Sequence, residues 1–300
     1  MRSRDVLLAV IVNVLWGINF AAIDLGLRDL PPLLFCALRF GLAAVPAIVL
    51  LRHPRVAWRW VLAVGLALGV VKFGLLFAAM AAGMPAGLSA LVLQSQAGFS
   101  VIFAVVLLGE RPGARRVVGL VVAAAGIAVV GSGVRGGPPA AFALILGAGV
   151  AWGLSNVATR RAAPPDMLRF MVWVSAVAAP VDLVLSLVLE GPGRDLAALR
   201  GLTLTGVASL GYVTFVATLF GFGVWGALLR RYGASAVAPF AMLAPVFAVA
   251  SGALILAQPV RPSDVIGGLF VLGGITLGLT RRSARAPSAA AEIPVPAGRS

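Results

Sequence analysis

Ten apolar stretches of helix length follow one another along the chain, separated by short polar gaps. They cover residues 5–25, 32–51, 60–81, 86–108, 114–132, 139–159, 167–189, 202–226, 234–256 and 262–280. An α-helix needs about 20 mainly apolar residues to cross roughly 30 Å of hydrocarbon. The pattern therefore predicts an all-α membrane protein with ten transmembrane helices, and the short gaps favour antiparallel neighbours.

The basic residues fall in alternate gaps between these stretches. The two chain ends and the even-numbered gaps hold 17 arginines, whereas the odd-numbered gaps hold 5. Because Lys and Arg concentrate in cytoplasmic flanks, we expect both termini in the cytoplasm of a multi-pass protein in a bacterial inner membrane. Residues 281–300 lack apolar periodicity and are expected to form a disordered cytoplasmic tail.

Composition agrees with a membrane protein and excludes several other classes. Mean hydropathy is +1.04 and only 11% of residues are charged, too few to cover a soluble domain of this length. The net charge of +14 comes from the flanks of the spans, so we expect a lipid bilayer and no nucleic acid as partner. Cys36 is the only cysteine and His53 the only histidine, so no metal site and no cofactor are expected.

The chain repeats itself weakly in two halves. Trp16-Gly17 recurs as Trp152-Gly153, Pro31-Pro32 as Pro164-Pro165, and the glycines at 119 and 126 as those at 267 and 274. Each half contains an odd number of spans, so the second half is inverted relative to the first. We expect two inverted five-helix repeats, residues 1–132 and 133–280, an architecture typical of secondary transporters with a site near the midplane.

Several short motifs carry a resemblance to a known family. They are WGINF at 16–20, LPP at 30–32, LRF at 38–40, GMPAGLSALVLQSQA at 83–97, GER at 109–111, FVAT at 215–218, GVWGALL at 223–229, VAP at 237–239 and PV at 245–246. Together they resemble the EamA-type members of the drug/metabolite transporter superfamily over residues 5–280. The similarity is greatest to the exporters of cysteine and O-acetylserine.

The resemblance implies a secondary transporter that exports small metabolites, amino acids or derivatives such as cysteine or O-acetylserine, by alternating access. Two departures stand out. Family members often carry a neutral polar residue where this chain has Lys72, and the second-half counterpart of the GER motif is AQP at 257–259. A drug or other metabolite transporter of the same fold remains the alternative. An intramembrane enzyme is the less favoured one, since no nucleophile–base pair or metal-ligand spacing lies at membrane depth.

Lys72 is the sharpest candidate for a functional residue. It is the only lysine among 24 basic residues, and it lies near the middle of the third span. A charge at that depth is costly, so an ionisable residue there suggests a site for substrate or proton. The alternative explanations are a structural ion pair and a side chain that reaches the interface.

Arg39, in the second span, admits two interpretations. It could form a structural ion pair with Asp24 at the outer end of the first span, which we favour slightly, or its planar guanidinium could hold a substrate carboxylate. Asp182, in the outer half of the seventh span, is expected to pair or cap locally.

Polar and aromatic side chains at similar depth complete the predicted substrate site. We expect Lys72, Arg39, Gln94 and Asn19 to bind a carboxylate, and aromatic rings to bind an ammonium group. The full predicted set is Lys72, Trp16, Asn19, Arg39, Gln94, Trp152, Asn156 and Tyr212. Of the two glutamines in the fourth span we favour Gln94 over Gln96. The residues leave proton coupling and the oligomeric state open.

Overall fold

A computed structural model describes residues 1–50, 54–133 and 139–279. The expected tail at 281–300 and His53 therefore lie outside the described residues. All the regular elements of the described part are helical. In order they are α1 (Ser3–Gly26), α2 (Pro32–Leu50), α3 (Trp58–Val64), η1 (Gly65–Lys72), α4 (Phe73–Ala81), α5 (Ala86–Leu93), α6 (Gln96–Leu108), α7 (Ala114–Gly133), α8 (Pro139–Ala162), α9 (Met167–Leu185), η2 (Ser186–Glu190), α10 (Pro192–Arg200), α11 (Leu204–Gly211), η3 (Tyr212–Phe220), α12 (Gly221–Tyr232), α13 (Ala234–Val237), η4 (Ala238–Met242), α14 (Leu243–Leu256) and α15 (Pro262–Leu279).

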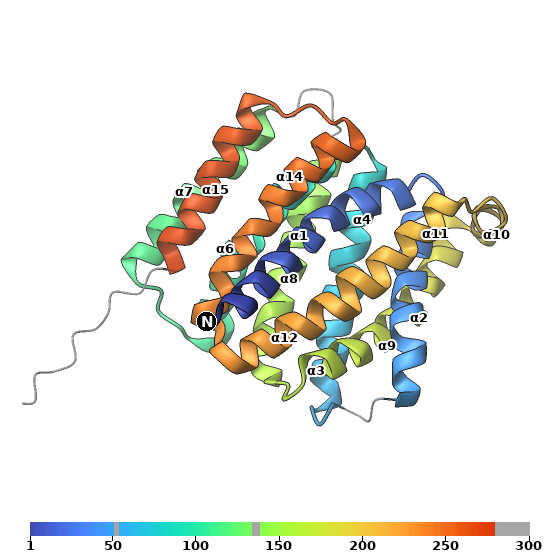
Figure 1. Cartoon of the computed structure of the whole chain (residues 1–300), viewed down its shortest axis with the longest axis horizontal. Coiled ribbons are helices and arrows are strands. Elements are labelled where there is room, and N and C mark those ends of the chain that lie inside the picture. The colour runs from blue at the N-terminus through green and yellow to red at the C-terminus, as the bar shows by residue number, and fades with distance from the viewer. Residues whose placement is uncertain (51–53, 134–138, 280–300) are drawn as a thin grey trace, which may run out of the picture.

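The predicted all-helical class is confirmed, and most predicted spans have a helix of sufficient length. Within the described residues, eight helices are long and apolar enough to cross a membrane. Two shorter apolar helices, Pro32–Val45 and Pro262–Gly278, lie where the second and tenth spans were predicted. One element was not predicted: the gap after the seventh span contains the short helix α10 (Figure 1).

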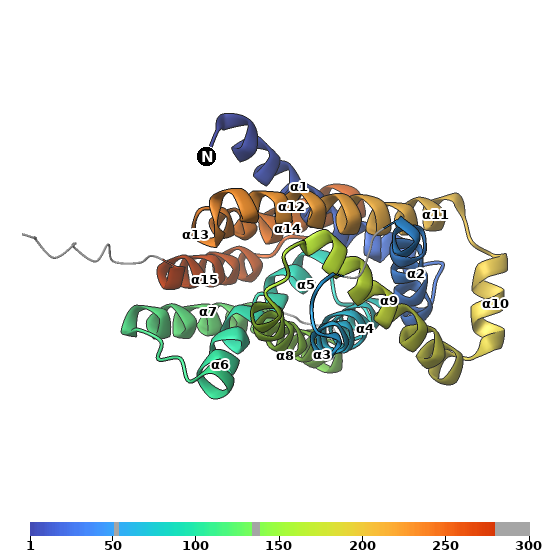
Figure 2. The ribbon, with the colours of Figure 1, turned by 90° about the horizontal axis from the view of Figure 1, so that it is seen from below.

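The helices form two layers, which Figure 2 shows edge-on. One layer contains α1, α12 and α14, and the other contains α3, α4, α6 and α8. The layers meet at two flanking pairs, α7 against α15 at one edge and α2 against α9 at the other (Figure 1). The first span of each half packs on the other half, α1 on α14 and α8 on α6.

Glycines allow the closest of these approaches. The first span of each half contributes one glycine that packs on the other half. A Cβ added at Gly17 in α1 would lie 2.7 Å from the backbone carbon of Phe247 in α14. A Cβ at Gly153 in α8 would lie 2.9 Å from the backbone carbon of Phe99 in α6. In the flanking pair, Gly119 faces Gly274 while Gly126 faces Gly267. Small residues let membrane helices approach this closely, which explains why the repeated landmarks are glycines.

Several spans are irregular at mid-length. The third and eighth spans contain the π-helical segments η1 and η3, and the fourth is broken between α5 and α6 at Gln94 and Ser95. The ninth passes through the 3₁₀ segment η4. Such departures from α-helical geometry loosen the backbone ladder and are frequent at functional sites. Each of the four contributes residues to the cavity described below.

Candidate functional site

A cavity of about 320 Å³ lies between the two layers, at the level of the irregular segments. Both halves of the chain line it. Its walls are Trp16, Asn19, Phe20, Arg39, Lys72, Phe73, Leu76, Ala90, Leu93, Gln94, Gln96, Trp152, Asn156, Ala217, Thr218, Phe222, Trp225, Ala241, Ala244 and Pro245. The lining is mostly aromatic and aliphatic, with a few polar groups that converge from different helices, as in sites for small molecules.

Two cations of the first half share one aromatic ring in this cavity. The Lys72 Nζ lies 3.2 Å from the centroid of Phe73, and the guanidinium carbon of Arg39 lies 4.1 Å from the same centroid. The two charges are therefore at most about 7 Å apart, the sum of those two distances. Lys72 also lies 4.9 Å from the ring of Trp152, and Arg39 lies 4.7 Å from the ring of Phe40. Cation–π contacts stabilise both side chains where bulk water is excluded.

Neither cation has a carboxylate partner among the described residues. Other arginines do form ion pairs there, among them Arg28–Asp24, Arg160–Glu110 and Arg231–Asp5. Arg39 donates one hydrogen bond, from Nη2 to the Thr218 hydroxyl at 2.8 Å, while its Nε and Nη1 are buried without a partner. The expected Arg39–Asp24 ion pair is therefore wrong. Asp24 reaches Arg28 one turn away along its own helix, whereas Arg39 lies deeper, against Phe73.

Asp182 forms no hydrogen bond or close ion pair with either cation, although it is near enough to Arg39 to attract it electrostatically. It is fully buried in α9, and both of its carboxylate oxygens lack a hydrogen-bond partner in the described part of the chain. The expected local pairing or capping of Asp182 is thus wrong, and its side chain does not line the cavity.

The π-helical segment η3 brings two backbone-linked groups to the cavity wall. The Thr218 hydroxyl donates to the Val213 carbonyl five residues earlier at 2.8 Å, while it accepts from Arg39. The Ala217 carbonyl accepts a hydrogen bond of 2.9 Å from the indole N–H of Trp16. Trp16 also contacts Phe222 and Trp225, with ring centroids 5.5 and 5.2 Å away. Segment η3 thereby fixes both Arg39 and Trp16.

Neutral amides line another part of the wall. The Asn156 Nδ2 donates to Gln96 Oε1 at 2.7 Å and to the Ser100 hydroxyl at 3.0 Å. The Ser100 hydroxyl in turn donates to the Gln96 carbonyl at 2.7 Å. This network joins α8 to α6 beside the break in the fourth span, while Gln94 lines the cavity from the break itself.

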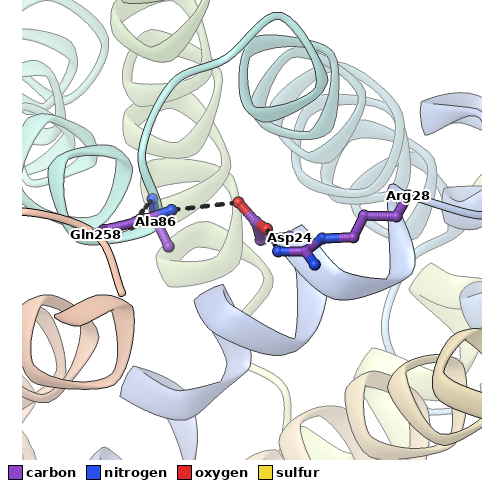
Figure 3. A network of polar contacts seen from close by, with 4 residues as sticks. All are labelled: Asp24, Arg28, Ala86 and Gln258. Carbon is purple, nitrogen blue, oxygen red and sulfur yellow. Dashed lines mark hydrogen bonds and ion pairs between the residues drawn. The ribbon is translucent and has the colours of Figure 1, made fainter. Parts of the chain in front are cut away.

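The ninth span ends in a polar bridge to two other helices, which we call the Gln258 bridge: Gln258, Ala86 and Asp24. The Gln258 Oε1 accepts from the Ala86 backbone N–H at 3.0 Å, and its Nε2 donates to Asp24 at 3.4 Å (Figure 3). Asp24 also pairs with Arg28 at 3.4 Å. Ala86 is the first residue of α5, where backbone N–H groups lack a partner within the helix.

The family model for the EamA-like transporter family matches residues 4–132 and again residues 140–280. The chain belongs to the EamA-like transporter family. The resemblance inferred from the motifs is thereby confirmed, and so is the interpretation of the chain as a multi-pass membrane transporter.

Curated relatives extend over almost the whole of this EamA-like chain. A "Probable amino-acid metabolite efflux pump" of Escherichia coli K12 is 35% identical over 282 residues, covering 92% of this chain and 94% of the relative. A protein of the same description from Salmonella typhimurium LT2 is 35% identical and covers 95% and 99%. A crystal structure with 20% identity and a TM-score of 0.64, covering 92% and 96%, has the same fold.

Within this EamA-like fold, the structure brings together seven of the eight residues predicted for the site. Tyr212 is the exception, because its hydroxyl donates to the Leu15 carbonyl at 2.9 Å and its side chain lines a separate outer groove beside Ser209. Gln96, which we ranked below Gln94, lines the same cavity. A helical wheel places those two side chains far apart, but the break between α5 and α6 changes their relative direction.

Sequence reasoning also missed Phe73, Phe222 and Trp225. Phe73 and Phe222 are aromatic residues in apolar spans, and nothing in the sequence distinguishes them from lipid-facing rings. Trp225 belongs to the GVWGALL motif, which was its only signal. The adjacent Lys72 was the one available signal for Phe73, since a cation at membrane depth requires a partner.

Proposed function

We propose that this EamA-like transporter exports small amino-acid metabolites across the bacterial inner membrane by alternating access. The observation that carries the proposal is the cavity itself, in which Lys72 and Arg39 lie without a carboxylate partner among aromatic rings and amides. A metabolite with a carboxylate group supplies the missing counter-charge. The efflux pumps related to this chain support amino-acid metabolites as the substrate class.

The proposal includes ten spans arranged as two inverted five-helix repeats, residues 1–132 and 133–280. The packing of Gly17 on α14 and of Gly153 on α6 supports this symmetry. In the first contact a glycine of the first half packs on the second half, and in the second contact the roles of the two halves are reversed. The two segments matched by the family model support it as well. The arginine bias supports cytoplasmic termini, and in the proposed arrangement the Gln258 bridge then lies at the outer face.

Alternating access requires that the cavity open at one face at a time. The outer parts of the fourth and ninth spans, α5 and α14, pack together, with Gly87 against Val249. The Gln258 bridge fastens the same two helices at their outer ends. We propose that release to the outside requires α5 and α14 to separate there and the Gln258–Ala86 hydrogen bond to break.

Metabolite profiling of the growth medium tests the export function. A strain that overexpresses the protein should accumulate at least one carboxylate-bearing amino-acid metabolite several-fold over a deletion strain. Overexpressed Lys72→Gln should abolish the difference. Arg115→Gln, which removes an exposed cation far from the cavity, is the matched control and should export normally. An unchanged medium, or accumulation of cationic amines alone, would contradict the proposal.

A further inference from the structure

The charge balance of the cavity narrows the substrate class that the proposed function leaves open. Resting on that function, we propose that the preferred substrates are carboxylates whose amine is masked, such as N-acylated amino acids, rather than free zwitterionic amino acids.

The first step in the argument is the excess of positive charge. Lys72 and Arg39 lie at most about 7 Å apart on the ring of Phe73 and are 5% and 2% exposed. None of the described residues that line the cavity is acidic. A substrate carboxylate is attracted by both charges. The Arg39 Nε and Nη1 have no hydrogen-bond partner but are enclosed by their neighbours, so the guanidinium must shift to donate to the carboxylate.

The second step concerns the ammonium group of a free amino acid. An ammonium binds well to a carboxylate or to the face of an aromatic ring. The cavity wall has no carboxylate in its described part, and the rings in contact with Lys72 and Arg39 already hold those cations, which leaves Trp16, Phe20, Phe222 and Trp225 as the other rings in the wall. Lys72 lies over Phe73 and Trp152, and Arg39 lies over Phe73 and Phe40.

The third step is the separation between the two ends of the substrate. In an α-amino acid the ammonium and the carboxylate are attached to the same carbon, so anchoring the carboxylate at Lys72 and Arg39 brings the ammonium close to both. Like charges repel strongly where water is excluded. Acylation replaces the ammonium by a neutral amide, whose N–H and C=O match the amides of Gln94 and Asn19 in the wall.

Lys72 is the residue that sets this preference. In a site with Arg39 alone, the guanidinium would balance the substrate carboxylate. The ammonium of a zwitterion would then be repelled by one cation instead of two. With Lys72 present, the site itself has two positive charges. A bound zwitterion has no net charge and neutralises neither of them, whereas a bound monoanion neutralises one.

Four methionine compounds with one side chain test the inference on the purified full-length protein in lipid nanodiscs, by titration calorimetry. N-acetylmethionine carries a carboxylate and no ammonium, and methionine carries both. N,N-dimethylmethionine keeps the ammonium and adds carbon atoms, which controls for size. Methionine amide has the ammonium and no carboxylate.

We expect N-acetylmethionine to bind at least tenfold more tightly than methionine or its dimethyl derivative, and methionine amide to bind most weakly. Lys72→Gln should weaken N-acetylmethionine at least tenfold and shrink its advantage over methionine. Lys72→Arg, which keeps the charge, should retain the preference, and Arg115→Gln should match the unaltered protein.

Methionine binding as tightly as N-acetylmethionine would overturn the inference and leave carboxylate export standing. Equal binding of N-acetylmethionine and dimethylmethionine would overturn it too, since size would then explain the preference. Binding of methionine amide in preference to every carboxylate would overturn both the inference and the proposed function. Absence of N-acetylmethionine binding to protein with a normal unfolding transition would likewise overturn the inference.

Discussion

The fourth and ninth spans end in the same backbone conformation, which we call the hook: a left-handed residue, then a residue whose N–H donates back into the helix. The side chains that follow the left-handed residue differ in chemistry. Gly109 (φ 68°) and Ala257 (φ 52°) are both left-handed. The next residues donate their backbone N–H six positions back, Glu110 to Ala104 at 3.2 Å and Gln258 to Gly252 at 3.1 Å. Each bond is one residue longer than the 6→1 bond of a Schellman cap, which spans five positions.

The side chains that follow the hook have different partners. Gln258 bridges the start of α5 and the end of α1 through neutral or singly charged hydrogen bonds. Glu110 instead forms an ion pair with Arg160 at the end of α8, where the side chains of Arg160 and Glu110 are 54% and 36% exposed. The two spans therefore share the same backbone ending. The side chain that follows this ending, Gln258 or Glu110, sets the interactions that hold each end of the bundle closed.

The largest effect should come from the scaffold that both halves share. Gly17→Ala and Gly153→Ala each place a Cβ within 3 Å of partner backbone, so each should cost about 1–3 kcal/mol in free energy of unfolding, as overpacking does. Gly41→Ala is the control, because no atom lies within 4 Å of its added Cβ. The measurement is thermal unfolding of purified protein. A large loss at only one of the two positions would contradict the symmetric packing.

The next effect should separate the two ends. Gln258→Ala removes the acceptor of the Ala86 N–H, which is worth about 1 kcal/mol for a helix cap. That corresponds to an approximately fivefold shift toward the state open at this end. A cysteine at Ala90 reports it, because Ala90 lines the cavity and is 4% exposed here.

A membrane-impermeant maleimide added from outside should therefore label Ala90→Cys about fivefold faster when Gln258→Ala is also present. The factor corresponds to the loss of about 1 kcal/mol from the cap. Glu110→Gln at the other end should not accelerate it. The native Cys36 is fully buried and provides the background rate. Equal acceleration by both variants would show that the two ends are not distinct.

Acid should weaken the Glu110 end in a defined direction. The hydrogen bond and charge of Arg160 lower the pKa of Glu110 below its ordinary value, which is about 4.3 for glutamate. A lowered pKa contributes stability that is present above the ordinary value and is lost as pH falls through the folded value. Unfolding temperature should thus be unaffected by this pair from pH 7 to about 5 and should fall only below about 4. Glu110→Gln should remove that part of the acid dependence, and an identical profile for the variant would contradict this.

A last prediction compares the two hooks directly. A left-handed conformation costs a non-glycine residue about 1–2 kcal/mol. Gly109→Ala should therefore destabilise the protein by about 1 kcal/mol, and Ala257→Gly should stabilise it by a similar amount. Chemical denaturation in mild detergent measures both, and changes of the same sign would contradict the assignment of the strain to backbone conformation.

Much of the fold was readable from the sequence because bilayer thickness fixes helix length and because glycines mark close contacts. The repeated glycines at 119 and 126 do meet those at 274 and 267. The break at Gln94 was not predicted, since no proline lies there, whereas Pro239 in η4 is a residue type that often kinks or breaks a span.

The site was predicted less completely, for two physical reasons. Polar residues at membrane depth identified Lys72 and Arg39, because burying a charge is costly wherever it occurs. The partner of Arg39 could not be predicted from depth alone, as Thr218 lies 179 residues away and reaches it through the π-helical η3. Tyr212 was misplaced because its direction depends on that same segment.

A disulfide between α5 and α14 tests alternating access most directly. A Cβ added at Gly87 would lie 3.4 Å from the Val249 Cβ and 2.8 Å from the Val249 Cα, so the two cysteines are close enough for a disulfide once α5 and α14 move slightly apart. In proteoliposomes, oxidised Gly87→Cys/Val249→Cys protein should lose at least tenfold of its transport of whichever methionine compound the unaltered protein moves fastest. Reductant should restore transport, and each single variant should be insensitive to oxidant. Full transport by completely cross-linked protein would contradict the account, because the cavity would then empty without separation of the two helices.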